Sequence, residues 1–328
     1  MMTVHVQGSE KTNTLSELME YYEVCNRAEG KSPRTIEWYS ANLRRFGSYL
    51  KDRHLSESID IIDKQVLRQY VLHLFKSKKF EDHPSIRCSN ETLSTATVHG
   101  HVRTIRAFFS WLVAEGLTED NIARDLRPPR MVKKAISTLS DEEIISIVRT
   151  LDPSSRTEAR NLTIFMLLID TGLRIGELMS LKMPDVHISQ GYMKVMGKGR
   201  KERLVPIGNS AQKALQRYVL RHRPRPSHAG IENVFLSAQG TPLTGNSMRL
   251  MFARLGQRSG VQRLHAHLCR HTFATRFLTN GGDVFTLQRI LGHSTLEMVR
   301  HYVNLASDDI LAKHQMCSPL DRLSLRRV

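Results

Sequence analysis

The chain has 328 residues, of which 40% are hydrophobic and 24% are charged, and its formal net charge is +16. These proportions are typical of a globular protein of about two domains, and the longest apolar run, residues 164–169, is too short to cross a membrane. The positive charge indicates a polyanionic partner, nucleic acid being the commonest, although a generally basic surface is an alternative. The scattered cysteines and the absence of a signal-peptide core predict a reduced, cytoplasmic setting.

The first third of the chain shows helical spacing of apolar residues in four stretches. They cover residues 14–29, 33–53, 64–78 and 92–115, and Pro33 falls in the first turn of the second. Gly30-Lys31-Ser32 resembles the end of a phosphate-binding loop, but Cys25 stands where that motif requires glycine. The polar stretch 78–91 is expected to be an exposed loop. We therefore predict a small all-helical bundle.

Basic residues decorate the outer faces of these expected helices. Phosphate contact is one interpretation of this pattern, and plain solvation of exposed charge is the other. The candidates for DNA contact in this part of the chain are Arg34, Arg44, Arg103 and Arg106.

A basic, proline-containing stretch follows the bundle. Adjacent prolines at positions 128 and 129 disfavour a helix and favour extended chain. Arg130 and Lys133 lie in this stretch and are further candidates for contact with a phosphate backbone. We therefore predict a helical domain at residues 1–126, a linker at 127–137 and a second domain at 138–328.

The second domain begins with a helix start signal. Ser140 and Glu143 fit a capping box before an apolar face. A strongly apolar helix follows at residues 160–170 and is expected to lie in the core. After Gly172, another helix carries Arg174 and Glu177 one turn apart, so that their side chains can meet. A local surface ion pair is the alternative interpretation.

A β-hairpin is predicted next, with strands at residues 191–196 and 201–207. The glycine-containing turn between them holds Lys198 at its tip, and Arg200 and Lys201 are candidates for DNA contact. Helices are expected at residues 209–222 and 244–259, and a short strand at 234–236.

Residues 265–304 carry side chains suited to chemistry on a phosphate. His267 and Arg270 lie one turn apart on an expected helix, His293 follows a glycine, and Tyr302 supplies a phenol as the attacking group. A zinc site was the competing hypothesis, since His267 and His271 are four residues apart on the helix, with His265 and Cys269 nearby. The arginines at positions 263 and 270 argue against a bound cation. A last helix is expected at residues 308–316.

These motifs resemble those of the tyrosine recombinase (phage-integrase-type) family, in particular its compact Xer-like members. The resemblance rests on TGLRIGEL, GKGRKERLVPIG, HLCRHTFAT, and LGHS with a tyrosine nine positions after its histidine. It implies a mainly α fold. The N-terminal bundle would be a SAM-like core-binding domain, and the C-terminal domain would be a mixed α/β catalytic domain with a small antiparallel sheet. Since residues 1–13 alone precede the first expected helix, we expect no separate arm-binding module.

The resemblance also implies a reaction. A site-specific recombinase of this type cleaves and rejoins DNA through a covalent 3′-phosphotyrosine and a Holliday junction, without a metal, another cofactor or ATP. The implied roles are as follows: Arg174 and Arg270 bind the scissile phosphate, Lys198 and His267 transfer protons, His293 fills the family's histidine-or-tryptophan position, Tyr302 is the nucleophile, and Glu177 supports the site.

The implied partners are double-stranded DNA sites and further protomers. Four copies would hold two sites, with a related recombinase as an optional second partner and residues 308–316 docking onto a neighbour. The expected location is the nucleoid within the cytoplasm. Two rival functions are a non-catalytic DNA-binding protein and a type IB topoisomerase-like enzyme. The biological role, whether chromosome dimer resolution, phage integration or movement of a mobile element, stays open.

Overall fold

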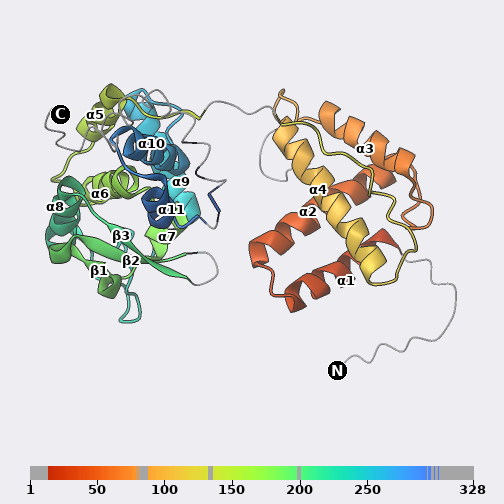
Figure 1. Ribbon diagram of the computed structural model, residues 1–328, viewed down its shortest axis with the longest axis horizontal. Coiled ribbons are helices and arrows are strands. Elements are labelled where there is room, and N and C mark those ends of the chain that lie inside the picture. Colours follow the sequence, from red (N-terminus) through yellow and green to blue (C-terminus); the bar gives the residue numbers. More distant parts are fainter. Residues whose placement is uncertain are drawn as a thin grey trace, which may run out of the picture. The chain divides into compact units, whose positions relative to one another are not determined.

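The computed structural model describes residues 14–79, 81, 88–131, 136–197, 201–293, 295, 296, 299 and 302. The chain divides into two compact units, residues 1–134 and 135–328, which are coloured from red to yellow and from yellow-green to blue in Figure 1. Within the described ranges, no helix has both the length and the apolar character that a membrane crossing requires.

The N-terminal unit contains the four predicted helices. They are α1 (Leu15–Ala28), α2 (Pro33–Asp52), α3 (Lys64–Lys76) and α4 (Thr95–Ala114). Each begins where a side-chain oxygen of Thr14, Ser32, Asp63 or Ser94 accepts a hydrogen bond from a first-turn backbone N–H.

The core of this unit combines aliphatic and aromatic side chains. Phe46 and Phe108 are fully buried, and the rings of Tyr22 and Phe108 meet edge to face with centroids 5.4 Å apart. Asn42 of α2 donates a 2.9 Å hydrogen bond to Thr104 of α4 inside the packed interface. Arg34, Arg44, Arg103 and Arg106 are all exposed, as the helical periodicity predicts.

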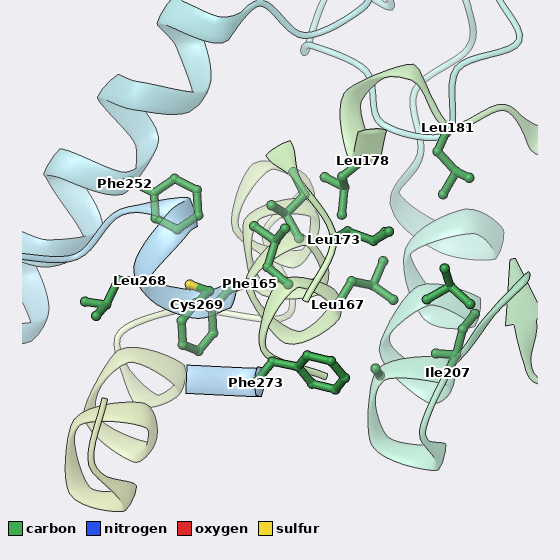
Figure 2. Packing of buried hydrophobic residues seen from close by; sticks show 14 of the residues in the cluster. Phe165, Leu167, Leu173, Leu178, Leu181, Ile207, Phe252, Leu268, Cys269 and Phe273 are labelled. Carbon is green, nitrogen blue, oxygen red and sulfur yellow. The ribbon is translucent and has the colours of Figure 1, made fainter. Parts of the chain in front are cut away.

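The C-terminal unit is built around α6 (Arg156–Thr171), which packs against α10 (Ala266–Thr279) and α8 (Asn209–Arg217). The other helices are α5 (Asp141–Arg149), α7 (Ile175–Ser180), α9 (Gly245–Ser259) and α11 (Val284–Leu291). Figure 2 shows buried side chains of this core, among them Phe165 of α6 and Phe273 of α10. The predicted capping box of Ser140 and Glu143 is present at the start of α5.

A three-stranded antiparallel sheet follows α7 in the order β1–β2–β3. Strand β2 (Tyr192–Met196) pairs with β3 (Glu202–Pro206), which confirms the predicted hairpin. Strand β1 (Val186–His187) has only two residues, too few to give a period-two pattern. The turn residues 198–200 lie outside the described residues.

The predicted strand at residues 234–236 was wrong. Only isolated bridges form nearby, at Asn233 and Leu236. Arginine side chains satisfy the backbone carbonyls that a neighbouring strand would otherwise bind: Arg223 donates to the carbonyls of Asn233 and Val234, and Arg160 donates to that of Leu236. The apolar run is therefore buried as irregular chain. The predicted helix at 209–222 is α-helical only as far as Arg217, and a π-helical turn (Tyr218–His222) continues it.

Candidate active site

Arg174 and Glu177 meet at the start of α7. Helix α6 ends at Gly172, whose φ of 62° is the left-handed conformation that favours glycine. The Glu177 carboxylate then accepts hydrogen bonds from the Arg174 backbone N–H at 3.0 Å and from its guanidinium at 2.9 Å. The Glu177 side chain is 8% exposed and that of Arg174 is 37% exposed, so the carboxylate of this pair is buried, unlike that of the surface contact considered as an alternative.

A third arginine completes this ion-pair network. Arg203 of β3 donates from Nη1 and Nη2 to the two Glu177 carboxylate oxygens at 3.1 and 2.7 Å, and from Nε to the Ile290 carbonyl at 2.7 Å. Burial alone would raise the pKa of Glu177, but the hydrogen bonds and charges of Arg203 and Arg174 outweigh it and lower that pKa. The carboxylate therefore stays ionised and orients both arginines.

Arg270 lies on α10 and is 1% exposed. Its Nη1 donates to the Gly172 carbonyl at 2.7 Å, and its Nη2 donates to the Leu291 carbonyl at 2.9 Å. Burial, together with the charge of Arg174, lowers the pKa of Arg270 to about 10, so the guanidinium stays protonated at neutral pH. Its position is therefore set by backbone carbonyls rather than by a carboxylate.

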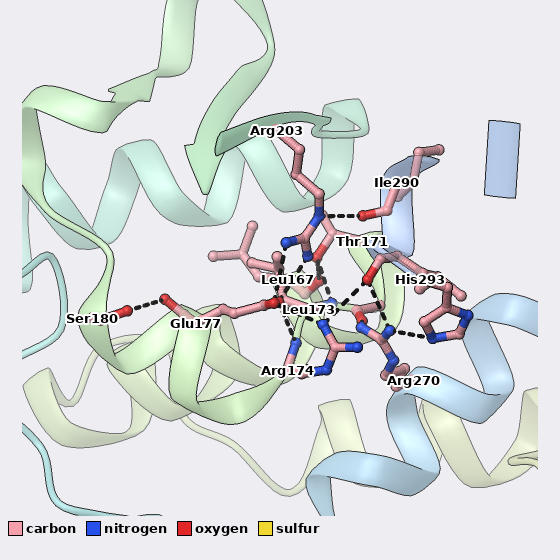
Figure 3. A network of polar contacts seen from close by, with 12 residues as sticks. Leu167, Thr171, Leu173, Arg174, Glu177, Ser180, Arg203, Arg270, Ile290 and His293 are labelled. Atoms are coloured by element: carbon pink, nitrogen blue, oxygen red, sulfur yellow. Dashed lines mark hydrogen bonds and ion pairs between the residues drawn. The ribbon is translucent and has the colours of Figure 1, made fainter. Parts of the chain in front are cut away.

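We call Arg174 and Arg270 the arginine clamp. Both guanidiniums donate to the Leu291 carbonyl, Arg174 at 3.4 Å and Arg270 at 2.9 Å, and Figure 3 shows them side by side. Arg174 and Arg203 both pair with the carboxylate of Glu177, whereas the described hydrogen bonds of the Arg270 guanidinium go to the Gly172 and Leu291 carbonyls and to His293. The excess positive charge favours an anion such as a phosphate at the clamp, where arginine forks match its oxygens.

His293 contacts the clamp from the residue after Gly292. Its Nε2 lies 2.7 Å from Nη2 of Arg270, an obligate donor, so the neutral ring carries its hydrogen on Nδ1. Within the described part of the chain, this buried Nδ1 has no hydrogen-bond partner. Burial and the charges of Arg270 and Arg174 lower the pKa of His293 to about 4, consistent with the neutral ring that the contact requires.

Tyr302, the predicted nucleophile, lies beside His271 rather than His293. The Tyr302 hydroxyl is 2.8 Å from Nδ1 of His271, and Tyr302 is 4% exposed. Burial raises the pKa of Tyr302, so the phenol is neutral at pH 7. His267 is exposed one turn before Arg270, and its ring meets that of His271 edge to face with centroids 4.4 Å apart.

Several predicted site residues fall outside the described residues, namely Lys198, Arg200 and Lys133. Arg130 and Lys201 are exposed. The ends of the hairpin are described, and the Gly197 N–H donates to the Lys201 carbonyl at 2.9 Å across the base of the turn. The expected docking segment, residues 308–316, also lies outside the described residues.

The histidine and cysteine side chains considered for zinc make other contacts. Nδ1 of His265 accepts the Leu268 N–H at 2.9 Å as the cap of α10, and Nδ1 of His271 contacts Tyr302. Cys269 is fully buried, and burial raises its thiol pKa to about 12. No group of three or more potential metal ligands converges anywhere in the described ranges.

Two residues of this site were missed from sequence, Arg203 and His271. Arg203 shares a strand face with the fully buried Val205, while the apolar Leu204 between them is 61% exposed. An arginine in phase with a core residue was therefore an available signal. His271 lies one turn after His267 on the same helix face, and this spacing alone does not distinguish a catalytic histidine from a zinc ligand.

Comparison with known proteins identifies the family of this chain. Residues 137–308 match the phage integrase family, and residues 18–119 match the SAM-like N-terminal domain of phage integrases. The tyrosine recombinase XerD of Staphylococcus aureus is 28% identical over 302 residues, which cover 92% of this chain and 97% of that protein. The corresponding protein of Staphylococcus haemolyticus has the same identity and coverage.

Solved structures share the fold. The post-cleavage complex of the XerH site-specific recombinase with its palindromic substrate matches with a TM-score of 0.68 and 22% identity, over 94% of this chain and 85% of that chain. A lambda integrase dimer bound to a core site matches with a TM-score of 0.66 and 21% identity, over 88% and 77%. The fold and the site thus define a tyrosine recombinase. This chain belongs to the phage integrase family.

Proposed function

We propose that this recombinase cleaves and rejoins DNA at specific sites through a covalent 3′-phosphotyrosine on Tyr302. Strand exchange between two duplexes would then pass through a Holliday junction. The observation that carries the proposal is the Tyr302 hydroxyl hydrogen-bonded to a histidine that lies next to Arg270 of the clamp. Structures of the XerH recombinase and of lambda integrase with DNA, which share this fold, support DNA as the substrate.

The clamp would stabilise the transition state. Attack on a phosphodiester places extra negative charge on the non-bridging oxygens, which Arg174 and Arg270 would bind from fixed positions. Removing one such preorganised donor typically costs about 3 kcal/mol of transition-state stabilisation. Glu177 and Arg203 would act by holding Arg174 in place.

Proton transfer would complete the chemistry. We assign proton transfer to Lys198 and His267, with Lys198 protonating the leaving 5′ oxygen, and we place His293 at the phosphate. The phosphotyrosine ester conserves the energy of the broken bond, and a 5′ hydroxyl can attack it to restore the backbone. No step of this scheme calls for a metal ion or ATP.

DNA binding would involve both units. Residues 1–126 would form the core-binding domain, residues 127–137 a basic linker, and residues 138–328 the catalytic domain. The proposed phosphate contacts are Arg34, Arg44, Arg103, Arg106, Arg130, Lys133, Arg200 and Lys201. Contacts of this kind position the protein and make affinity depend on salt.

The proposed assembly is a homo-tetramer on two DNA sites, with a related recombinase as an optional second partner. Residues 308–316 would dock onto a neighbouring protomer. Such an enzyme would act on the cytoplasmic nucleoid, in chromosome dimer resolution, phage integration or the movement of a mobile element.

A trapped covalent complex tests this function. The wild-type protein should become linked to a nicked DNA substrate, whereas Tyr302→Phe should bind the same DNA without becoming linked. A covalent complex formed by Tyr302→Phe would exclude Tyr302 as the nucleophile. A plasmid with two target sites separates recombination from simple relaxation, which is the outcome expected of a topoisomerase-like enzyme.

A further inference from the structure

The described hydrogen bond of the Tyr302 hydroxyl goes to His271. The reaction scheme above gives this histidine no role. His271 Nδ1 and Tyr302 Oη are 2.8 Å apart, and the two rings are tilted by 49° with centroids 5.6 Å apart. The distance is that of a well-formed hydrogen bond. It joins α10 to the segment that carries the nucleophile, 31 positions away in the sequence.

We propose that His271 is a further catalytic residue, which accepts the proton of the Tyr302 hydroxyl as the phenol attacks DNA. This role rests on the proposed function, since it requires Tyr302 to be the nucleophile.

The neighbouring groups of the site are poorly placed for this role. Arg174 and Arg270 are protonated donors with no acceptor atom. Nε2 of His293 already accepts from Arg270. His267 contacts the edge of the His271 ring and is exposed to solvent, and the described hydrogen bond of the Tyr302 hydroxyl goes to His271 instead.

His271 is in the protonation state that a base needs. Burial and the nearby His267, His265 and Arg270 lower its pKa to about 4, so the ring is neutral at pH 7. If the Tyr302 hydroxyl donates to Nδ1, the ring hydrogen lies on Nε2.

The proposed step moves one proton from Tyr302 to His271 and exchanges one phosphorus–oxygen bond for another. The Tyr302 oxygen forms a bond to phosphorus while its proton moves to His271 Nδ1. The bond between phosphorus and the 5′ oxygen breaks, and that oxygen takes a proton from the acid that we assign to Lys198. The products are the phosphotyrosine ester, an imidazolium at His271 and a free 5′ hydroxyl. In religation, His271 returns its proton to the departing Tyr302 oxygen.

DNA binding would strengthen His271 as a base. A weakly basic ring cannot deprotonate a phenol of raised pKa in advance, so the proton must move as the bond to phosphorus forms. Burial is the largest cause of the low pKa of His271, and the charge of Arg270 is a lesser one, which the scissile phosphate would offset.

The test measures single-turnover formation of the covalent complex by the full chain on a suicide DNA substrate. His271→Ala should slow this step by about 10²–10⁴-fold, the usual contribution of a positioned base, with unchanged DNA affinity. His271→Asn keeps a side-chain oxygen near the position of Nδ1 but is not basic, so it should remain slow. A rate for His271→Asn within about threefold of wild type would mean that His271 only positions Tyr302, and would overturn the proposal.

A sulfur substitution identifies the side of the reaction on which His271 acts. A substrate with sulfur in place of the bridging 5′ oxygen has a leaving group that needs no protonation. Lys198→Ala should recover its rate on this substrate, whereas His271→Ala should stay slow. Recovery of His271→Ala would place His271 on the leaving-group side and refute its role as a base.

The matched control is His228→Ala, which removes an exposed histidine of the same unit and should leave the rate unchanged. Thermal melting checks that each variant folds. If His271→Ala does not fold, the rate of His271→Asn alone decides the test. Failure of the two hypotheses is distinguishable. A covalent complex with Tyr302→Phe refutes the proposed function, whereas an inactive Tyr302→Phe beside a fully active His271→Ala refutes only the role of His271.

Discussion

Arg203→Ala tests how far the clamp depends on a residue that touches no phosphate in the proposed scheme. The substitution removes two hydrogen bonds to Glu177 and one to the Ile290 carbonyl. The side chains of Arg203 and Glu177 are 11% and 8% exposed, so solvent cannot replace these contacts easily. Breaking a buried pair costs about 3–5 kcal/mol, because the remaining charge is left uncompensated.

We expect the lower end of this range for Arg203→Ala, about 3 kcal/mol, because Glu177 keeps its contacts with Arg174. For a unit of this size, the loss should lower the melting temperature by about 6–12 °C. Exchanging both partners, Arg203→Met with Glu177→Gln, should recover part of it, since no buried charge is then left unpaired.

The positions of the tryptophans provide an internal control for this measurement. Trp38 and Trp111, the two tryptophans of the chain, lie in the N-terminal unit. Tryptophan fluorescence should therefore melt at the wild-type temperature while far-UV circular dichroism shows the earlier transition of the C-terminal unit. Lys182→Ala breaks the exposed pair with Glu232 and should change neither signal. An Arg203→Ala melt indistinguishable from that of Lys182→Ala would refute the reasoning.

Three further outcomes are expected. His271 and His293 have pKa values of about 4 in the folded chain and about 6.5 when unfolded. The stability that they confer is therefore complete above about pH 6.5 and is lost as the pH falls towards about 4. A urea midpoint that does not fall over this range would contradict their burial as neutral rings. Gly172→Ala should destabilise the C-terminal unit by more than about 1 kcal/mol, because the φ of Gly172 is 62° and the new Cβ would lie 2.4 Å from the Phe273 ring. An unchanged melting temperature would argue against the left-handed turn. Arg103→Ala should reduce the dependence of DNA affinity on salt by about one counterion without slowing cleavage at saturating DNA, and an unchanged slope would remove Arg103 from the proposed contacts.

Local signals predicted most of the fold because they act over a few residues. The capping box at Ser140 and the helical spacing around Phe46 and Phe108 each specify an element without reference to distant chain. The failure at residues 234–236 has the opposite cause. Whether that apolar run forms a strand depends on which groups bind its carbonyls, and here they are Arg160 and Arg223, which are brought close only by tertiary packing.

The candidate site likewise contains residues that the sequence predicts and a contact that depends on tertiary packing. The family resemblance predicts Arg174, Arg270 and His293 in one site. In the structure, Arg174 and Arg270 both donate to the Leu291 carbonyl, and His293 contacts Arg270. The partner of the Tyr302 hydroxyl could not be derived from spacing, because His267 and His271 occupy the same helix face. Only the packing of the tyrosine-bearing segment against α10 distinguishes them.

The C-terminal end of α11 has a consequence for when the protein is active. The last carbonyls of a helix have no partner within the helix, and a helix of eight residues is barely stable alone. Here Arg174, Arg203 and Arg270 donate to the carbonyls of Ile290 and Leu291. The same contacts thus terminate the helix and hold Arg174 and Arg270, the proposed phosphate-binding pair. We therefore expect folding of α11 and formation of the clamp to be coupled. We expect a molecule in which this helix has frayed to leave DNA intact, so partial unfolding would not produce stray strand breaks.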